Sequence, residues 1–256
     1  MLPCVLLTLA TIWSTTAHMQ LYSPPPFKAI NNPNTITPDT TLNYPHNCCG
    51  ETTPMPCRGY LSLLGTSEGA SVATWTAGSN QTFSLWGPAP LGGNHYGGSC
   101  QVGFSTDKGA SFHVVSSYEG NCPLRNGGME PEDQQFGFTV PKDLPGGEVV
   151  FAWTWMNREQ EFFMSCAAVT IEGGQASNAS SVVDGSVAST GMKRSVGKRD
   201  DAVVAFSQRP IMLFADVNNG CLSPKTTAEL KYPDPGPVVV QGDGEYPLEL
   251  PSGTCG

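Results

Sequence analysis

Short stretches rich in β-branched and aromatic residues recur along this chain, and turn-forming residues separate them. Such side chains favour extended backbone, while clusters such as Pro145-Gly146-Gly147 mark turns. No stretch of ten or more residues shows the apolar period of a helix. The pattern predicts an all-β fold, an antiparallel β-sandwich with long loops. The predicted strands are residues 70–77, 82–86, 99–105, 111–117, 135–140, 147–157 and 161–171.

The composition changes between residues 173 and 201, where Gly, Ser, Ala and Asn dominate and aromatic residues are missing. This composition is typical of a flexible linker. We therefore expect a β-sandwich domain at 18–172, a linker at 173–207 and a C-terminal segment at 208–256. Dibasic pairs at 193–194 and 198–199 are either ordinary linker charge or sites of proteolytic trimming.

The C-terminal segment has fewer than 50 residues and is small for a core of its own. We expect it to pack on the sandwich, with residues 210–217 as a strand. The alternative is a carbohydrate-binding appendage, which would normally display a row of exposed aromatic residues. The segment contains only Phe214, Tyr232 and Tyr246.

The first 17 residues read as a secretory signal peptide. An apolar run at 2–13 is followed by small residues at 14–17, and the run is too short to span a bilayer of roughly 30 Å. Cleavage after Ala17 would make His18 the first residue of the mature chain. We expect a secreted, extracellular protein that does not cross a membrane.

Acidic residues outnumber basic residues by 22 to 13, which gives a net charge of −9. Nucleic-acid binding depends on clustered Lys and Arg, so nucleic acid is not an expected partner. The glycosylation sequons at Asn80 and Asn178 agree with a secretory route.

Eight cysteines follow the signal and suggest disulfides, in 105 possible pairings. The pairing stays open, and a bond between the neighbours Cys48 and Cys49 is not expected, because it would be strained. Three reasonable pairs are Cys221–Cys255, Cys100–Cys122 and Cys57–Cys166.

The chain has four histidines, and His18 has special chemistry if it is the mature N-terminus. It then offers its α-amino nitrogen and a ring nitrogen, which close a chelate ring on one metal. The amine has an unperturbed pKa of about 7.7–8.0, so a metal can displace its proton near neutral pH. One further imidazole completes a T-shaped set of three nitrogens, which suits Cu(II).

His95 is the preferred third donor, because four nearby glycines leave room for metal and substrate to approach. His113 lies in a predicted strand, where a surface or hydrogen-bonded imidazole is more usual. His46 could bind zinc together with Cys48 and Cys49, although cysteines in an oxidising compartment favour disulfides.

Several motifs resemble the fungal lytic polysaccharide monooxygenases of auxiliary activity family 11. They are the mature start His18-Met19, the loop 97–101 (GGSCQ), the runs 151–157 (FAWTWMN) and 164–167 (MSCA), and the C-terminal runs 218–221 (NNGC) and 233–237 (PDPGP). The resemblance covers most of residues 18–171 and the C-terminal segment. It implies an immunoglobulin-like or fibronectin-like sandwich with one copper ion in a histidine brace of His18 and His95. It also implies a monomer that acts on insoluble polysaccharide, typically chitin, with an external reductant and oxygen or hydrogen peroxide.

The resemblance places the axial residue of the copper site, usually tyrosine, at Phe163. Phe163 has no hydroxyl, so it can only shield that face of the metal. Residues two apart in a strand share a face, so Glu161 is the carboxylate nearest to that side. Glu161 could then act as the acid/base on a water or peroxide, or it is an ordinary exposed strand carboxylate.

Four aromatic residues have open roles. Trp153 and Trp155 share a strand face, where core packing is the simpler role and the draining of oxidising equivalents the alternative. Tyr22 or Tyr96 could stack on sugar rings. The leading hypothesis is oxidative cleavage of glycosidic bonds by a copper-dependent enzyme. Its rivals are an extracellular copper-binding protein without oxygenase activity and a non-catalytic protein that binds chitin or cell walls.

Overall fold

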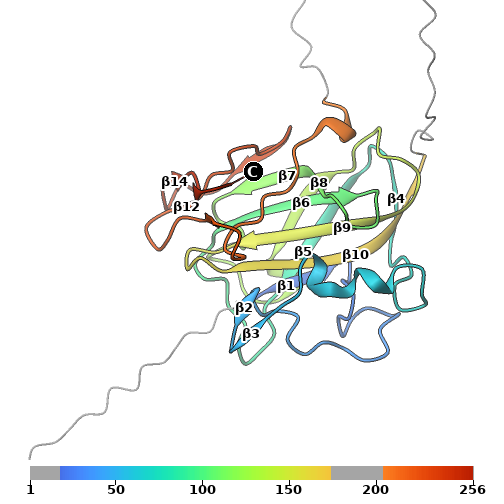
Figure 1. The fold of residues 1–256 in the computed structure, drawn as a ribbon, viewed down its shortest axis with the longest axis horizontal. Helices are drawn as coiled ribbons and strands as arrows, with labels where there is room; N and C mark the ends of the chain where they lie inside the picture. The colour runs from blue at the N-terminus through green and yellow to red at the C-terminus, as the bar shows by residue number, and fades with distance from the viewer. Residues whose placement is uncertain (1–17, 174–203, 256) are drawn as a thin grey trace, which may run out of the picture.

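The computed structural model describes residues 18–173 and 204–255. The expected signal peptide, Asn178, both dibasic pairs and most of the expected linker lie outside the described residues. Within them the chain forms two main β-sheets that pack face to face (Figure 1). Helical structure in these two ranges is limited to three short 3-10 segments. The predicted β-sandwich is confirmed.

The smaller sheet has three strands and the larger sheet has six, and most neighbouring strands are antiparallel. Parallel pairing occurs between β10 and β4, between β7 and β13 and in one small strand pair. The smaller sheet consists of β1 (Gln20–Ser23), β5 (Asn80–Trp86) and β8 (Gln135–Thr139), in that order. The larger sheet consists, in order, of β13 (Val239–Gln241), β7 (His113–Glu119), β6 (Ser99–Ser105), β9 (Gly147–Met156), β10 (Phe162–Glu172) and β4 (Thr74–Thr76). The small pairs are β2 (Asn47–Cys48) with β3 (Glu51–Thr52), β11 (Cys221–Leu222) with β15 (Ser252–Gly253), and β12 (Glu229–Leu230) with β14 (Leu248–Glu249). The 3-10 segments are η1 (Cys57–Leu63), η2 (Pro131–Asp133) and η3 (Phe206–Gln208).

Aromatic side chains fill the core between the two sheets. Trp75 packs edge-on against Phe104, Phe138 and Phe151, with ring centroids 5.4 to 6.1 Å apart. Trp153 and Trp155 are fully buried in the same core, as their expected packing role requires. These rings come from both sheets, so their contacts pack the two sheets against each other.

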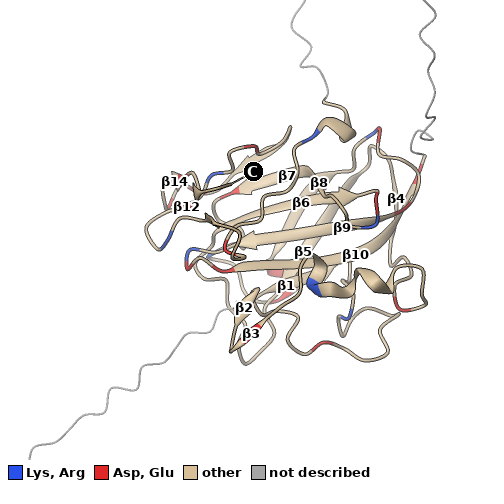
Figure 2. Ribbon diagram, viewed as in Figure 1, with Lys and Arg blue, Asp and Glu red and all other residues tan. Residues whose placement is uncertain are grey.

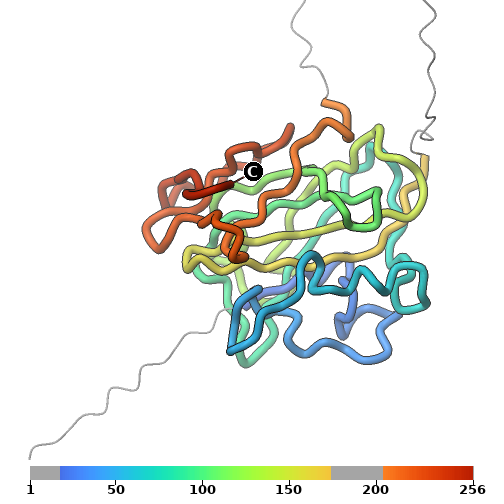
Figure 3. The backbone as a smooth tube through the Cα atoms, viewed as in Figure 1, coloured from blue at the N-terminus to red at the C-terminus, as the bar shows by residue number. Residues whose placement is uncertain are grey.

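The opposite face of the larger sheet is covered by irregular chain. Loops from the first third of the sequence lie along one part of it and the C-terminal segment along another (Figure 3). Phe27 and Tyr232 contribute buried side chains from these two regions to one cluster, which also contains Phe162 and Met164 of β10. Strand β10 therefore alternates between two cores, because Phe163 points to the opposite side, into the core between the sheets.

The strand predicted at residues 210–217 is wrong. Ile211 forms a single bridge with His113, and the chain then leaves the edge of β7, where Leu213 N–H donates to the side chain of Gln101. The same edge of β7 pairs with β13 a few residues further on, so residues 210–217 have only a short length of free edge to occupy. A positive φ at Asp216 then turns the chain away.

All eight cysteines in the described residues are paired. Three of the bonds are Cys57–Cys166, Cys100–Cys122 and Cys221–Cys255, which are the three favoured pairs. The fourth joins Cys48 to Cys49, so the expectation that these two do not bond is corrected. They lie at the tip of the β2–β3 hairpin, where the positive φ of Cys49 turns the chain and brings the two neighbouring side chains together. The other six cysteines are already joined in the three bonds above.

Charged side chains of the described residues lie mostly in loops and at strand ends (Figure 2). None of the helical segments in these residues is long and apolar enough to cross a membrane. The strands thus supply packing, and the loops at their ends carry the polar side chains from which a site can be built.

Candidate metal site

The backbone of His18 is bonded to the loop that carries His95. His18 N–H donates to the carbonyl of Leu91 at 3.0 Å, and Gly93 N–H donates to the carbonyl of His18 at 3.4 Å. His18 and Gly92 form a parallel bridge between these hydrogen bonds. Two histidines that are far apart in the sequence therefore stand on directly adjoining segments.

His95 sits in a turn with unusual backbone geometry. His95 and Tyr96 have φ angles of 46° and 55°, values that non-glycine residues adopt only when their surroundings enforce them. The side chain of Asn94 provides one such restraint. Its amide donates to the carbonyls of Leu124 and Arg125, and its oxygen accepts the N–H of Tyr96. The turn is thereby fixed on both sides of the imidazole.

The two imidazoles each carry a buried nitrogen without a hydrogen-bond partner among the described residues. These atoms are Nδ1 of His18 and Nε2 of His95. As whole residues, His18 is 4% exposed and His95 is 9% exposed. Buried polar atoms are nearly always bonded, so two such atoms on adjoining segments require an explanation. Nitrogen lone pairs in this setting fit a metal that prefers imidazole, and copper is one such metal.

The charge state of His18 agrees with a role as a ligand. Burial, followed by the proximity of His95, lowers the pKa of the His18 imidazole to about 4. The ring is therefore neutral near pH 7, and the neutral form is the one that can bind a metal.

Phe163 lies beside this pair. Its ring is 6.1 Å from the ring of His18 and stacks on Trp155 at 4.4 Å, and the residue is 2% exposed. Tyr44 approaches His18 from another segment, with ring centroids 4.9 Å apart. Tyr44 could not be predicted from the sequence, because it lies in an irregular loop that has no periodic pattern and whose position is set by tertiary packing.

Glu161 is the carboxylate closest to the unpartnered atom of His95. Its Oε2 lies 3.2 Å from Nε2 of His95, and the side chain is 28% exposed. Asn157 orients it, since the Asn157 amide donates to Oε2 of Glu161 at 2.6 Å. On the other side of the ring, Oε1 of the more exposed Glu159 lies 3.5 Å from Nδ1 of His95.

The two remaining histidines do not join the pair. Nδ1 of His113 lies 2.8 Å from the carbonyl of Arg209, so that imidazole is hydrogen-bonded, as is usual in a strand. The zinc alternative at His46 fails, because Cys48 and Cys49 are bonded to each other. In the part of the chain that the structure describes, no three His, Cys, Asp or Glu side chains are grouped to hold a metal. A metal at His18 and His95 would therefore need a further donor that is not one of these side chains.

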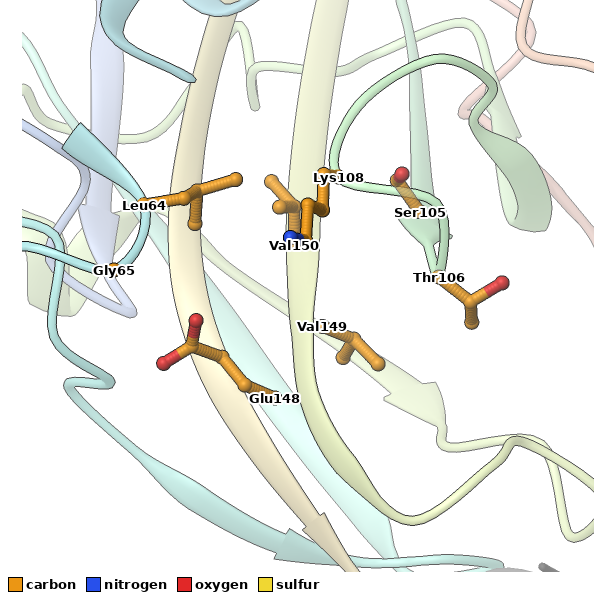
Figure 4. Close-up of a pocket in the computed structure, with 8 residues that line it drawn as sticks. All are labelled: Leu64, Gly65, Ser105, Thr106, Lys108, Glu148, Val149 and Val150. Carbon is orange, nitrogen blue, oxygen red and sulfur yellow. The ribbon is translucent and has the colours of Figure 1, made fainter. Parts of the chain in front are cut away.

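Two cavities among the described residues have linings that do not include the two histidines. One of about 260 Å³ is lined by Leu64, Ser105 and Glu148 among others, at the start of β9 (Figure 4). A second, of about 550 Å³, has a mainly apolar lining that includes Ile211 and Phe214. Neither contains His18, His95, Glu161 or Phe163, so the candidate site rests on the two imidazoles and not on a pocket.

Fold and site together define a β-sandwich protein with two buried imidazole nitrogens that lack hydrogen bonds among the described residues and lie on adjoining segments. No family model matches the chain. The chain is 34% identical over 180 residues to AA11 family lytic polysaccharide monooxygenase A of Aspergillus fumigatus. The aligned residues cover 68% of this chain and 74% of that protein. It belongs to the AA11 family of lytic polysaccharide monooxygenases.

Two further comparisons give the extent of the similarity. An AA11 family lytic polysaccharide monooxygenase of Aspergillus oryzae is 28% identical over 234 residues, which cover 87% of this chain and 47% of that longer protein. Among solved structures, the lytic polysaccharide monooxygenase AA15 from Thermobia domestica in the Cu(I) state matches 60% of this chain and 98% of its own, with 15% identity and a TM-score of 0.40.

Proposed function

We propose that this protein is a secreted, monomeric, copper-dependent lytic polysaccharide monooxygenase that cleaves glycosidic bonds in insoluble polysaccharide, with chitin as the main substrate. One observation carries the proposal. Nδ1 of His18 and Nε2 of His95 are both buried without a hydrogen bond among the described residues, on segments that are hydrogen-bonded to each other, and the Glu161 carboxylate stands 3.2 Å from Nε2.

The donor set fits copper. After cleavage behind Ala17, the nitrogen of His18 is a free amine and joins the ring nitrogen of the same residue as a chelate. Nε2 of His95 supplies the third nitrogen, and a set of three nitrogens suits Cu(II). Copper bound there supplies the redox chemistry through which oxygen or hydrogen peroxide, with an external reductant, oxidises the carbon of a glycosidic bond.

The chain's own residues provide proton handling and water exclusion. Glu161 holds its carboxylate 3.2 Å from Nε2 of His95, with Asn157 bonded to one of its oxygens. This carboxylate can accept a proton from the co-substrate and return it, as a general acid/base. Phe163 presents an apolar ring to the His18 side, and its stacking on Trp155 excludes water there.

Tyr96 is the residue best placed to contact a sugar ring. It follows His95 directly and is 70% exposed, whereas Tyr22 packs edge-on against Trp86 at 5.9 Å. An exposed aromatic ring beside the metal offers a flat apolar surface for a pyranose. Chitin as the substrate follows from the resemblance to the family.

The test uses the mature protein with an authentic His18. It is loaded with copper, supplied with ascorbate and incubated with β-chitin and, separately, with cellulose, and soluble products are identified by mass spectrometry. We expect oxidised oligosaccharides from chitin. A matched protein with one extra residue before His18 has no chelating amine, so its copper affinity and products should fall sharply.

A second candidate is an extracellular copper-binding protein without oxygenase activity. The observation in its favour is Phe163, which lies next to His18 and has no oxygen atom to offer the metal. Tight copper binding without oxidised products from either polysaccharide would select this candidate. Binding to chitin without copper binding would select the non-catalytic wall-binding protein.

A further inference from the structure

A charged pair from two distant segments lies directly behind the His95 turn. Arg125 follows Cys122 in a loop, and Glu229 belongs to β12 in the C-terminal segment. Nη2 of Arg125 lies 3.0 Å from both carboxylate oxygens of Glu229, and their side chains are 6% and 1% exposed. The two groups of such a buried pair stay together, because separating them would leave each charge buried without its partner, which strongly destabilises the folded state.

Both members of the pair hold the backbone that carries His95. Gly98 N–H donates to Oε1 of Glu229 at 2.8 Å, and Nη1 of Arg125 donates to the carbonyl of Tyr96. The same Glu229 oxygen accepts Asn121 N–H at 3.0 Å. The residues just after His95 are thus bonded to the C-terminal segment through one carboxylate and one guanidinium.

Two glycines make this approach possible. A Cβ on Gly97 would stand 2.5 Å from Oε1 of Glu229, and a Cβ on Gly120 would stand 2.7 Å from Oε2. Both glycines also have positive φ, which other residues rarely adopt. The turn and the carboxylate are fitted to each other at a distance that no side chain would permit.

The far side of Arg125 is anchored within the same C-terminal segment. Its Nε donates to Oδ2 of Asp243 at 2.7 Å, its Nη2 donates to Oδ1 of Asp243 at 2.9 Å, and its guanidinium lies 4.8 Å from the ring centre of Tyr246. Tyr246 also carries the guanidinium of Arg158, at 3.4 Å. The C-terminal segment therefore contacts both the turn that bears His95 and the loop that precedes Glu161.

Contacts with that second loop support the same conclusion. Thr226 N–H donates to the carbonyl of Arg158 at 2.6 Å, and the amide of Gln160 donates to the carbonyl of Ser223 at 2.7 Å. These bonds hold Arg158 and Gln160, the residues just before Glu161, whose side chain points toward His95.

We propose that Glu229, acting with Arg125, is a positioning residue that sets the His95 turn for metal binding, so that the C-terminal segment is a working part of the copper site. The inference rests on the proposed function in that it takes His95 as a ligand. Glu229 itself does not touch the metal position; it acts through the backbone of residues 96–98.

The test compares Glu229→Ala with Glu249→Gln, a change to an exposed carboxylate on the neighbouring strand β14. Copper affinity is measured by calorimetry on proteins with a free His18 amine, well below the unfolding temperature of each variant. Loss of a partner that orients a ligand typically lowers metal affinity by about 10- to 100-fold. We expect at least about a 10-fold loss and an altered Cu(II) electron paramagnetic resonance spectrum for Glu229→Ala, and wild-type values for Glu249→Gln.

A measurement on the metal-free protein separates this inference from the proposed function. In Glu229→Ala the NMR resonances of the His95 ring should shift and broaden, while those of His113, bonded to the carbonyl of Arg209, should not move. A wild-type protein that fails to bind copper overturns the proposed function, and the ring resonances still decide whether Glu229 positions His95. Glu229→Gln should give an intermediate result, because its amide oxygen can still accept the N–H of Gly98 while Arg125 loses the negative charge of its buried partner.

Arg125→Lys provides the same comparison if Glu229→Ala does not fold. It keeps a positive charge beside Glu229 and removes the N–H that reaches Tyr96, so a smaller loss of copper affinity and a shift of the His95 ring are expected. A folded Glu229→Ala or Arg125→Lys protein with unchanged copper affinity, an unchanged Cu(II) spectrum and unchanged His95 resonances overturns the inference.

Discussion

The phenyl ring of Phe163 stacks on the indole of Trp155 with centroids 4.4 Å apart and an angle of 25° between the planes. The two residues are direct partners across β10 and β9, so the stacking is fixed by the register of two long strands. The same phenyl ring lies 6.1 Å from the imidazole of His18. The sandwich core therefore continues up to the candidate site and presents an apolar ring to it.

Replacing Phe163 with tyrosine should change the metal site. The new hydroxyl enters a buried apolar position and costs about 1–3 kcal/mol of stability when no partner receives it. Copper bound to His18 and His95 should receive that hydroxyl as a weak extra ligand, so the Cu(II) electron paramagnetic resonance spectrum should shift.

The matched control for this change is Phe162→Tyr. Phe162 is equally buried but faces the other core, so the hydroxyl should destabilise the fold and leave the copper spectrum unchanged. Identical spectra for Phe163→Tyr and the wild type would show that this ring does not face the metal.

Glu161→Gln should slow the reaction without removing the metal. The amide keeps the size of the side chain and can still pair with Asn157, but it cannot accept a proton. Loss of a general acid/base typically lowers the rate by about 10²- to 10⁴-fold, so the rate of release of oxidised products should fall by at least about 100-fold. Copper affinity should stay within a few-fold of wild type.

The control for Glu161 is Glu172→Gln, an exposed carboxylate at the far end of the same strand. It should have wild-type activity. If Glu161→Gln retains the full rate, Glu161 is an ordinary surface carboxylate, which is the alternative that its position in the sequence already allowed.

The pattern of side chains predicted the central strands well and the edges poorly. Strand β6 has the predicted bounds, and β9 and β10 agree within one residue at each end, because buried central strands are rich in β-branched and aromatic residues. The strand β13 was missed. It is three residues long with exposed side chains, and only its pairing with β7 makes it a strand.

Chemistry at single residues could be predicted where the residue type itself is rare. Four histidines leave few candidate pairs, and the structure places His18 and His95 on adjoining segments. The support around them had no comparable signal. Glu229 is 131 residues from Gly98, and a glutamate in a loop-rich segment looks the same in the sequence whether it is exposed or buried.

The stability of the metal-free protein should depend on pH through His18. Burial lowers its pKa to about 4 in the folded protein, from the ordinary histidine value of about 6.5. The unfolded chain therefore binds more protons between these values, so the stabilising contribution is complete above about pH 6.5 and is lost as the pH falls toward 4. Between pH 7 and pH 5 this group should account for about 2 kcal/mol of lost stability, which urea unfolding can measure.

His18→Gln isolates that contribution. Burial also lowers the pKa of His46, so part of the pH dependence should remain in the variant. Only the wild type loses the contribution of His18 as the pH falls. The difference in the free energy of unfolding between wild type and His18→Gln should therefore narrow from pH 7 to pH 5. A constant difference across that range would mean that the imidazole of His18 is not held neutral by its surroundings.

Gly98→Ala should be more damaging than Gly147→Ala, although both glycines have φ angles in the region that other residues avoid. Gly98 has φ +121° and Gly147 has φ +112°, so the backbone strain of an alanine is similar at the two positions. At Gly98 the added Cβ would also stand 2.5 Å from the carbonyl oxygen of Met156 and 2.6 Å from Nε1 of Trp155, whereas at Gly147 it would meet no atom within 4 Å. Overpacking of this kind costs about 1–3 kcal/mol beyond the strain, and chemical denaturation of the two variants measures the difference. Gly98 also donates its N–H to Glu229, so Gly98→Ala should weaken copper binding while Gly147→Ala leaves it intact. Equal stabilities and equal copper affinities in the two variants would contradict the close fit of the His95 turn against β9.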